Sequence, residues 1–306
     1  MNSKSIDRVV GSRDMVQGML NSYLSKKGKN VRPEMVSIFG DLLGIPEAEI
    51  EVLGRVAEMI HTASLIHDDV IDRAEKRRGQ VAMNMLMSNC HAVLSGDYLM
   101  AQAIHELTLS NNIHNLQLLS QALQDMIEGE FIQDSFKSGA YPTLNDLINI
   151  AEKKTGALMS WSCAAAAVYS EQDQAIISNC QEFGKKLGVA FQMIDDNLDF
   201  SHSTGKPFAG DLKEGLINFT VLEMLNIYPE LYYPVGQLRG KVCDEYPWSD
   251  NELNTAISLV RSKANEVMDE AISLLNEIIN NLEVKPERRA VQNIYDLIEK
   301  MRSRSL

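Results

Sequence analysis

The chain has 306 residues, of which 45% are hydrophobic and 23% are charged, and its formal net charge is -13. This apolar content is enough to bury a large core, which excludes a disordered chain. The acidic balance argues against a general nucleic-acid-binding protein, because binding to phosphate backbones needs a cationic surface.

The opening residues, MNSKSIDRVVGSRD, lack the apolar core of a signal peptide, and no apolar run is long enough to cross a bilayer. The four cysteines are scattered without a C-x-x-C pair, which is typical of free thiols in a reducing compartment. We therefore expect a cytoplasmic protein without a transmembrane segment.

Apolar residues recur at helical spacing along most of the chain, and nothing indicates a strand-rich protein. A first helix should begin near Pro33. Longer helices are predicted over Ile50–Ile71, Leu116–Phe136, Leu144–Val168 and Ala256–Leu282. Breaks are predicted at Gly44–Pro46, Arg78–Gln80, Ser138–Pro142 and Ser201–Gly210, and the proline-containing region Tyr228–Trp248 should be irregular. Without a repeat or a linker, residues 1–306 are expected to form one all-α domain.

Two acidic clusters, Asp68–Asp72 and Asp195–Asp199, each read D-D-x-x-D within a predicted helix. The first and last Asp of each cluster lie about one turn apart and share a face, where like charges repel. Mg²⁺ would offset this repulsion, since it binds carboxylate oxygens and commonly bridges one or two of them to a substrate phosphate. The repeated pattern predicts two facing clusters that hold a diphosphate from both sides.

The first cluster alone is equally consistent with a solvated acidic turn, because short matches arise by chance and cationic residues follow it. The second copy favours metal binding for both. Each cluster also falls near a helix end, where carboxylates oppose the helix dipole at a cost of about 0.3–1 kcal/mol. Bound cations would remove that cost.

Several cationic residues accompany these clusters. Lys29 and Arg32 stand three apart before the first helix, Arg77 and Arg78 follow the first cluster, and Lys206 follows the second. Lys154 lies in an apolar helix beside Gly156, which weakens a helix by about 1 kcal/mol relative to alanine. Taken singly, each of these charges has the simpler interpretation of a surface residue.

The segment Ile60–Gly79, with its IHTASLIHDD string, resembles the first aspartate-rich motif of trans-prenyltransferases, the polyprenyl diphosphate synthases. GKNVRP resembles the G-K-x-x-R-P segment of that family, and KTGAL resembles its K-T-G/A motif. GVAFQMIDDNLDF resembles its second aspartate-rich motif, and GKPFAGDLKEG resembles the loop that follows. These segments occur in the family's order over residues 28–215.

The resemblance implies an all-α isoprenoid synthase fold, with antiparallel helices around a deep central cavity, and a homodimer. It implies a magnesium site, with three ions, whose ligands would be Asp68, Asp69, Asp72, Asp195, Asp196 and Asp199. By match to the motifs, the allylic diphosphate would be contacted by Arg77, Lys154, Gln192 and Lys206. The diphosphate of isopentenyl diphosphate would be bound by Lys29, Arg32, His61 and Arg78. Without the resemblance, His61 would be interpreted as a core histidine.

The implied reaction breaks an allylic C–O bond, which releases pyrophosphate and leaves a carbocation for the isopentenyl double bond to attack. Fixed cations stabilise the charge that grows on the leaving group. Apolar walls must keep water from the carbocation. Phe191 and the carbonyl group of Thr155 would help to stabilise it.

Ala63 and Ser64 precede Asp68 by five and four residues, one turn along the expected product channel. In the family, bulky side chains there stop elongation, so these small residues, with Ile60 one turn deeper, predict an open channel. The expected product is an all-trans polyprenyl diphosphate longer than C20, which would be passed to a membrane.

Some residues depart from the family pattern, namely Asn30, Val81, Ala82, Leu216 and the Asn218–Thr220 segment. They leave three alternatives open. The chain could be a partner-dependent or non-catalytic subunit of a heteromeric synthase, or a shorter-chain geranylgeranyl or farnesyl diphosphate synthase. A terpene cyclase of the same fold ranks lower, because its second metal motif normally carries Asn, Ser and Glu.

Overall fold

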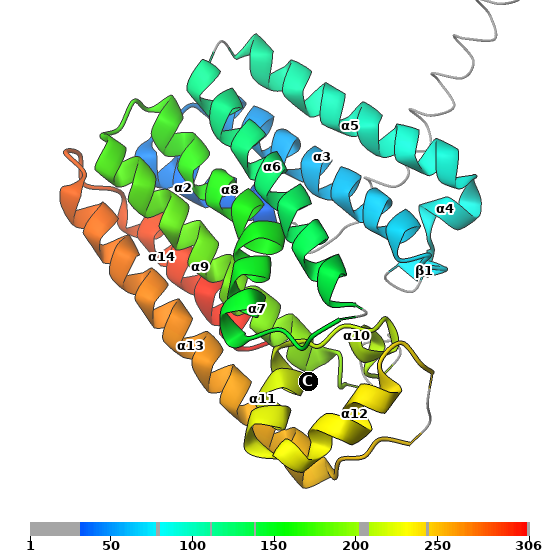
Figure 1. Ribbon diagram of the computed structural model, residues 1–306. Helices are drawn as coiled ribbons and strands as arrows, with labels where there is room; N and C mark the ends of the chain where they lie inside the picture. The colour runs from blue at the N-terminus through cyan, green and yellow to red at the C-terminus, as the bar shows by residue number, and fades with distance from the viewer. Residues whose placement is uncertain are drawn as a thin grey trace, which may run out of the picture.

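The computed structural model describes residues 31–77, 80–110, 112–137, 139–201, 208–242 and 245–304, and for residues 76, 77 and 80 it gives the backbone alone. Most of the described residues are helical, which confirms the all-α prediction (Figure 1). None of the helices described here is both long enough and apolar enough to cross a bilayer.

The first part of the chain forms α2 (Val31–Leu43), α3 (Glu47–Ile71), α4 (Met83–Leu86), α5 (Asn89–Leu109) and α6 (Ile113–Phe136). Between α3 and α4, the short strands β1 (Lys76–Arg77) and β2 (Gln80–Val81) pair antiparallel. The middle forms α7 (Leu144–Ala151), the π-helical turn η1 (Glu152–Gly156), α8 (Ala157–Tyr169) and α9 (Gln174–Leu198). The last part forms α10 (Gly210–Lys213), α11 (Phe219–Ile227), η3 (Pro229–Leu231), α12 (Tyr232–Leu238), α13 (Asp250–Asn281) and α14 (Arg288–Arg302).

Local capping explains where several helices begin. At the start of α7, the Thr143 hydroxyl group accepts the Asp146 N–H, and the Asp146 carboxylate accepts the Thr143 N–H in return. Ser249 and Glu252 form the same reciprocal pair at the start of α13. Each pair satisfies N–H groups that have no partner within the helix.

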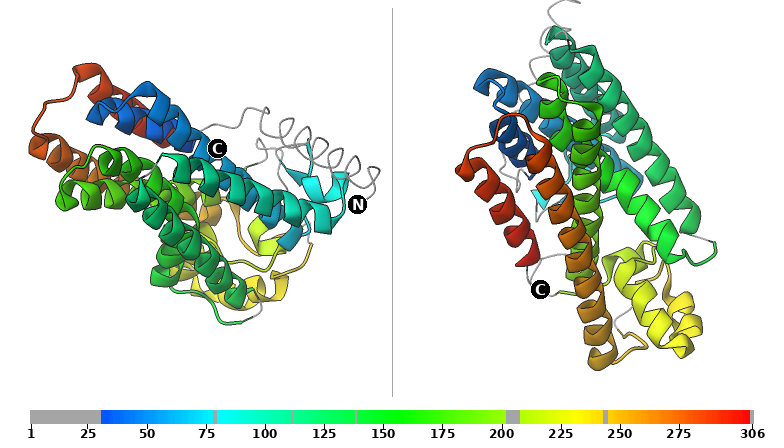
Figure 2. Two further views of the ribbon diagram at one scale, coloured as in Figure 1. Left: turned by 90° about the horizontal axis from the view of Figure 1, so that it is seen from above. Right: turned by 90° about the vertical axis from the view of Figure 1, so that its left-hand side faces the viewer.

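The long helices pack side by side with alternating direction, α5 against α3, and α8 and α13 against α9 (Figure 1). As a consequence, α3 and α9 run the same way, and their carboxyl ends lie toward the same end of the bundle. Each acidic cluster stands at one of these two ends, since α3 stops at Ile71 and α9 at Leu198. The arrangement around α13 and α14 can be followed in the side view of Figure 2.

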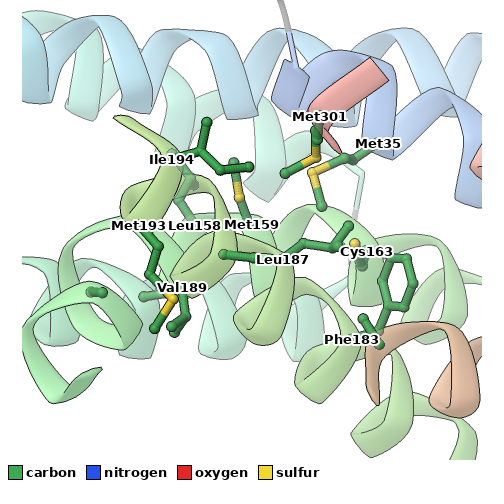
Figure 3. Close-up of a cluster of buried hydrophobic side chains, with 14 of the residues drawn as sticks. Met35, Leu158, Met159, Cys163, Phe183, Leu187, Val189, Met193, Ile194 and Met301 are labelled. Carbon is green, nitrogen blue, oxygen red and sulfur yellow. The ribbon is translucent and has the colours of Figure 1, made fainter. Parts of the chain in front are cut away.

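The core surrounds α8, in which every residue from Ala157 to Val168 is buried. This helix packs against α2, α3, α6 and α9, so its whole circumference is covered. Figure 3 shows the apolar side chains at the contact with α9, among them Leu158, Met159 and Leu187. Flexible methionine side chains fill irregular gaps here, since Met35 and Met301 reach the same cluster from α2 and α14.

Contact between α8 and α9 is close enough to require glycine at position 184. A Cβ atom there would lie 2.4 Å from the Met159 carbonyl oxygen and 2.7 Å from the Ser160 Cα. Both atoms belong to the backbone, so neither can rotate out of the way. The two helices can approach this closely only without that side chain.

Two sequence-based expectations about the helices need correction. The helix expected over 144–168 is divided by η1. The sequence did not indicate this division, because one extra residue in a turn leaves the apolar spacing on either side nearly unchanged. The region 228–248, expected to be irregular, contains η3 and α12. Pro234 is tolerated in α12 because it lies in the first turn, where its missing N–H is not needed.

Candidate active site

Asp196 is the most enclosed carboxylate of the second acidic cluster, with 5% of its surface exposed. One of its oxygens accepts the backbone N–H of Phe219, at 2.9 Å. The other accepts the side-chain amide of Gln192, at 2.8 Å. The sequence places Gln192 one helical turn before Asp196, so both side chains share the face of α9 that meets the start of α11.

The pKa of Asp196 is raised well above its ordinary value, first by burial and then by the negative charge of Asp211. Asp211 lies in α10, where its carboxylate accepts the side-chain amide of Asn218, at 2.9 Å. Two neighbouring carboxylates of which one is buried make an unfavourable pair unless a cation joins them. Their hard oxygen atoms suit a divalent ion such as Mg²⁺, so the donor set present here fits the metal that the clusters predict.

The other two aspartates of this cluster have different partners. Asp199 ends α9, and its carboxylate oxygens accept the backbone N–H groups of Gly210 and Asp211, at 3.0 and 3.2 Å. This contact fixes α10, and with it Asp211, beside the cluster. Asp195 pairs with Arg304, whose Nη2 lies 3.1 Å from its Oδ1.

Lys154 and Thr155 lie in the π-helical turn η1, where α6 and α9 both pack against the backbone. The Lys154 ammonium group lies 2.5 Å from a Glu130 carboxylate oxygen and also donates to Gln133. The Thr155 hydroxyl group donates to the Gln192 side-chain carbonyl, at 2.9 Å. A chain of hydrogen bonds therefore runs from η1 through Gln192 to Asp196.

Glycine is also required where α9 meets this turn. A Cβ atom at Gly188 would lie 2.4 Å from the Gly156 Cα and 2.7 Å from the Gly156 nitrogen. The π-helical turn and α9 therefore touch backbone to backbone. This contact explains how Thr155 comes within hydrogen-bonding reach of Gln192.

The first acidic cluster lies at the end of α3. Asp69 is fully buried, and its backbone carbonyl accepts the Asn84 side-chain amide, at 2.9 Å. Asp72 ends the helix and pairs with Lys137, at 3.4 Å. Burial lowers the pKa of Lys137, but Asp72 and Asp134 together outweigh it, and the net shift is upward.

A cavity of about 100 Å³ joins several of these groups. Its polar wall is formed by Gln133, Lys154, Gln192, Asp196, Asp211 and Asn218. Its apolar wall is formed by Phe136, Pro142, Leu147, Ile150, Ala151, Leu216, Ile217 and Phe219. Of the predicted residues, Lys154, Gln192 and Asp196 therefore meet around one cavity. Thr155, Asp195, Asp199 and the described side chains of the first cluster do not line it.

Other predicted site residues that the structure describes lie away from the lining of this cavity. Arg32 lies at the start of α2, His61 and Ser64 are partly buried on α3, and Ala63 is fully buried there. Lys29, Arg78, Lys206 and the side chain of Arg77 lie outside the described residues. Among the side chains that the structure describes, no three acidic, histidine or cysteine groups converge as a metal site by themselves.

Sequence reasoning missed several groups that contact the predicted ones. Asp211 lies within GKPFAGDLKEG but was assigned no role, and its acidic character after a second D-D-x-x-D was a usable signal. Asn218 and Phe219 stood out only as departures from the family pattern. No sequence pattern indicated four further residues, because each reaches its partner from another part of the chain. These are Lys137, Glu130, Gln133 and Arg304.

Comparison with known proteins identifies the family of this chain. Residues 13–233 match the model of the family described as polyprenyl synthetase. A prenyl transferase of Synechocystis sp. is 33% identical over 96% of this chain and 92% of its own length. The chloroplastic solanesyl diphosphate synthase 2 of Arabidopsis thaliana is 32% identical over 96% of this chain and 72% of its own length.

A solved structure has the same architecture. The polyprenyl synthase of Caulobacter crescentus CB15, crystallised with calcium and isoprenyl diphosphate, matches with a TM-score of 0.75 at 25% identity, over 100% of both chains. The fold is thus the isoprenoid synthase fold expected from the sequence. This chain belongs to the polyprenyl synthetase family and is a chain-elongating prenyltransferase.

Proposed function

We propose that this chain, as one domain over residues 1–306, condenses isopentenyl diphosphate with an allylic diphosphate and releases pyrophosphate. The observation that carries this proposal is the hydrogen-bonded chain from Thr155 through Gln192 to Asp196. It couples the turn that bears Lys154 to the second acidic cluster, around a cavity with one polar and one apolar wall. The reaction needs both walls, because charge grows on a diphosphate while an adjacent carbocation must stay dry.

Magnesium would be held by Asp68, Asp69 and Asp72 on α3 and by Asp195, Asp196 and Asp199 at the end of α9, with Asp211 beside them. When bound, it supplies positive charge that stabilises the departing diphosphate. The relative from Caulobacter crescentus supports this assignment, since it was crystallised with a divalent cation and an isoprenyl diphosphate. The number of ions remains the three predicted from the resemblance.

The chain's own groups would act at both ends of the breaking bond. Lys154 supplies a fixed positive charge toward the allylic diphosphate, and Gln192 holds the Asp196 carboxylate in place. The apolar wall formed by Phe136, Leu147 and Ile150 excludes water from the carbocation. Proton loss after coupling would pass to the departing pyrophosphate, so no side-chain base is required.

Purified protein tests this function directly. Incubated as a single chain with farnesyl diphosphate, isopentenyl diphosphate and Mg²⁺, it should yield a polyprenyl diphosphate, and none after chelation of the metal. Activity that appears only after a second protein is added would instead support the partner-dependent subunit. A hydrocarbon product free of diphosphate would support a terpene cyclase.

The product is proposed to be longer than C20. The solanesyl diphosphate synthase among the relatives supports a long product, and so do the small side chains of Ala63 and Ser64 on α3. Ala63 is fully buried against protein atoms, whereas Ser64 is partly exposed. Ser64 therefore offers the cleaner position for closing the channel, because a larger side chain at Ala63 would also overpack the core.

Ser64→Phe is expected to shorten the product, since the aromatic ring would stand where the growing chain passes. Reversed-phase chromatography of the dephosphorylated products measures the length distribution. Arg55→Phe adds the same ring to an exposed position of the same helix and should leave the distribution unchanged. Products of unchanged length from the Ser64 variant would refute the channel assignment.

A homodimer is proposed through α5 and α6, whose outer faces carry exposed apolar side chains. These are Val93, Leu94, Ile104, Leu109, Ile113, Ile127 and Phe131. Ile127 and Phe131 lie one turn apart on α6, and Phe131 is 74% exposed. Apolar side chains concentrated on two consecutive helices are typical of a surface that a partner covers.

The wild-type protein should sediment at twice the 34.2 kDa mass of one chain. The double substitution Ile127→Glu with Phe131→Glu should give a monomer, because two carboxylates would have to be buried in the interface. Tyr233→Glu, at a position 77% exposed on α12, is the control and should leave the dimer intact. A double variant that still sediments as a dimer would place the interface elsewhere.

The cytoplasmic location also stays a prediction, which cell fractionation would test.

A further inference from the structure

The end of α14 contacts the second acidic cluster through Arg304. Its guanidinium group lies 3.1 Å from an Asp195 oxygen and 4.4 Å from the centre of the Phe191 ring. Phe191 and Asp195 stand four residues apart on α9, so one helical face presents an aromatic ring and a carboxylate to the same cation. The Arg304 side chain is 17% exposed, and that of Asp195 is 31% exposed.

The position of Arg304 is fixed by a second arginine. Arg261 on α13 donates from Nη2 to the backbone carbonyls of Arg302 and Arg304, at 3.2 and 2.9 Å. These carbonyls lie at the end of α14 and just beyond it, where a helix offers its carbonyl groups no N–H partner of its own. The segment after α14 is thereby held across α13, with Arg304 directed at Asp195.

The ion pair itself is poorly matched. An arginine bound to a carboxylate commonly uses two parallel N–H groups. Here Nη2 makes the contact, while the buried Nε and Nη1 of Arg304 have no hydrogen-bond acceptor among the described residues. Buried donors without acceptors cost free energy, so the pair should yield readily to a stronger cation at Asp195.

We propose that Arg304 is a positioning residue that neutralises Asp195 before substrate binds and must give way when a divalent cation arrives. The inference rests on the proposed function, in which Asp195 is a metal ligand. By Coulomb's law, a guanidinium group next to the carboxylate lowers the affinity for a second cation there. Arg304 would thus weaken metal binding in the absence of diphosphate and favour binding of the metal together with its substrate.

Mn²⁺ binding without substrate tests this inference, since Mn²⁺ takes the same oxygen ligands as Mg²⁺ and its free form is measured by electron paramagnetic resonance. Arg304→Ala should lower the Mn²⁺ dissociation constant about fivefold, the effect expected from removing one partly buried ion pair. Arg304→Gln should act in the same direction. Arg261→Ala, which frees the segment after α14, should give a smaller decrease.

Lys300→Ala is the matched control, because it removes one positive charge from the same helix, where Lys300 pairs with Glu34. It should bind Mn²⁺ as the wild type does. Circular dichroism melting would check that each variant is folded. If Arg304→Ala does not fold, Arg304→Gln replaces it in the Mn²⁺ binding test.

Asp195→Asn separates the possible failures. If it weakens Mn²⁺ binding while both Arg304 variants bind Mn²⁺ no more tightly than the wild type, the inference about Arg304 is wrong and the proposed metal site stands. If Asp195→Asn leaves Mn²⁺ binding unchanged, Asp195 is not a metal ligand, and the inference falls together with that part of the proposed function.

Discussion

Asp196→Asn is expected to lower turnover strongly and at the same time to stabilise the fold. The variant removes a carboxylate that is buried next to Asp211, so the free energy of unfolding at neutral pH should rise by about 1–2 kcal/mol. The hydrogen bonds can be kept, because the carbonyl of the introduced asparagine can accept the Phe219 N–H while its amide donates to Gln192. Gln192 needs only to reverse its amide group, since the Thr155 hydroxyl group can accept as well as donate.

The loss of turnover should be at least about 10²-fold, because an anionic ligand at the centre of the proposed site is replaced by a neutral group. Steady-state kinetics at saturating Mg²⁺ measures it. Asp173→Asn, at the exposed start of the same helix, is the control and should retain activity. A variant of Asp196 with wild-type turnover would exclude this carboxylate from catalysis.

The pH dependence of stability follows from the raised pKa of Asp196. At acidic pH the carboxyl group is protonated in both the folded and the unfolded chain, so its burial costs no charge desolvation. As the pH rises above the unfolded pKa, ionisation favours the unfolded chain, so stability falls until the pH passes the folded pKa. The difference in melting temperature between the Asp196→Asn variant and the wild type should therefore grow from acidic to neutral pH.

Gly184→Ala should destabilise the protein by about 2–4 kcal/mol, because its new methyl group would overlap the backbone of α8. Alanine normally strengthens a helix by about 1 kcal/mol relative to glycine. Here the added Cβ would lie 2.4 Å from the Met159 carbonyl oxygen, and α8 is packed on all sides and cannot move away. Steric overlap should outweigh helix propensity.

Urea denaturation followed by circular dichroism measures the change in unfolding free energy. Gly54→Ala is the matched control, since the nearest atom to its Cβ would be 3.8 Å away on Pro33. That variant should be as stable as the wild type or more stable by up to about 1 kcal/mol. Equal stability of Gly184→Ala and wild type would show that α8 and α9 can separate at little cost.

The helices were predictable because their apolar periodicity is long and strong. The predicted helix over 50–71 corresponds to α3 and that over 116–136 to α6, and both acidic clusters fall at helix ends as expected. The π-helical turn η1 was not predictable in this way. Its one extra residue changes the spacing of apolar side chains too little to be detected in the sequence pattern. In the structure, however, this turn places Lys154 against Glu130.

The candidate site was predictable only where its residues lie on one helix. Gln192 and Asp196 are four residues apart, so the sequence alone indicates that they are neighbours. The pairing of Asp196 with Asp211 crosses a loop, and that of Asp195 with Arg304 spans the last third of the chain. Such contacts depend on how helices pack, which no local pattern records.

The hydrogen bond from position 219 to the Asp196 carboxylate has an evolutionary consequence, because its donor is a backbone amide. Replacement of the side chain by any residue except proline leaves this donor in place, so selection can vary position 219 without releasing the carboxylate. Here Asn218 begins α11 by accepting the Val221 N–H, and Thr220 donates to Asn197. Divergent residues in the segment 218–220 are therefore compatible with an unchanged geometry of the candidate active site.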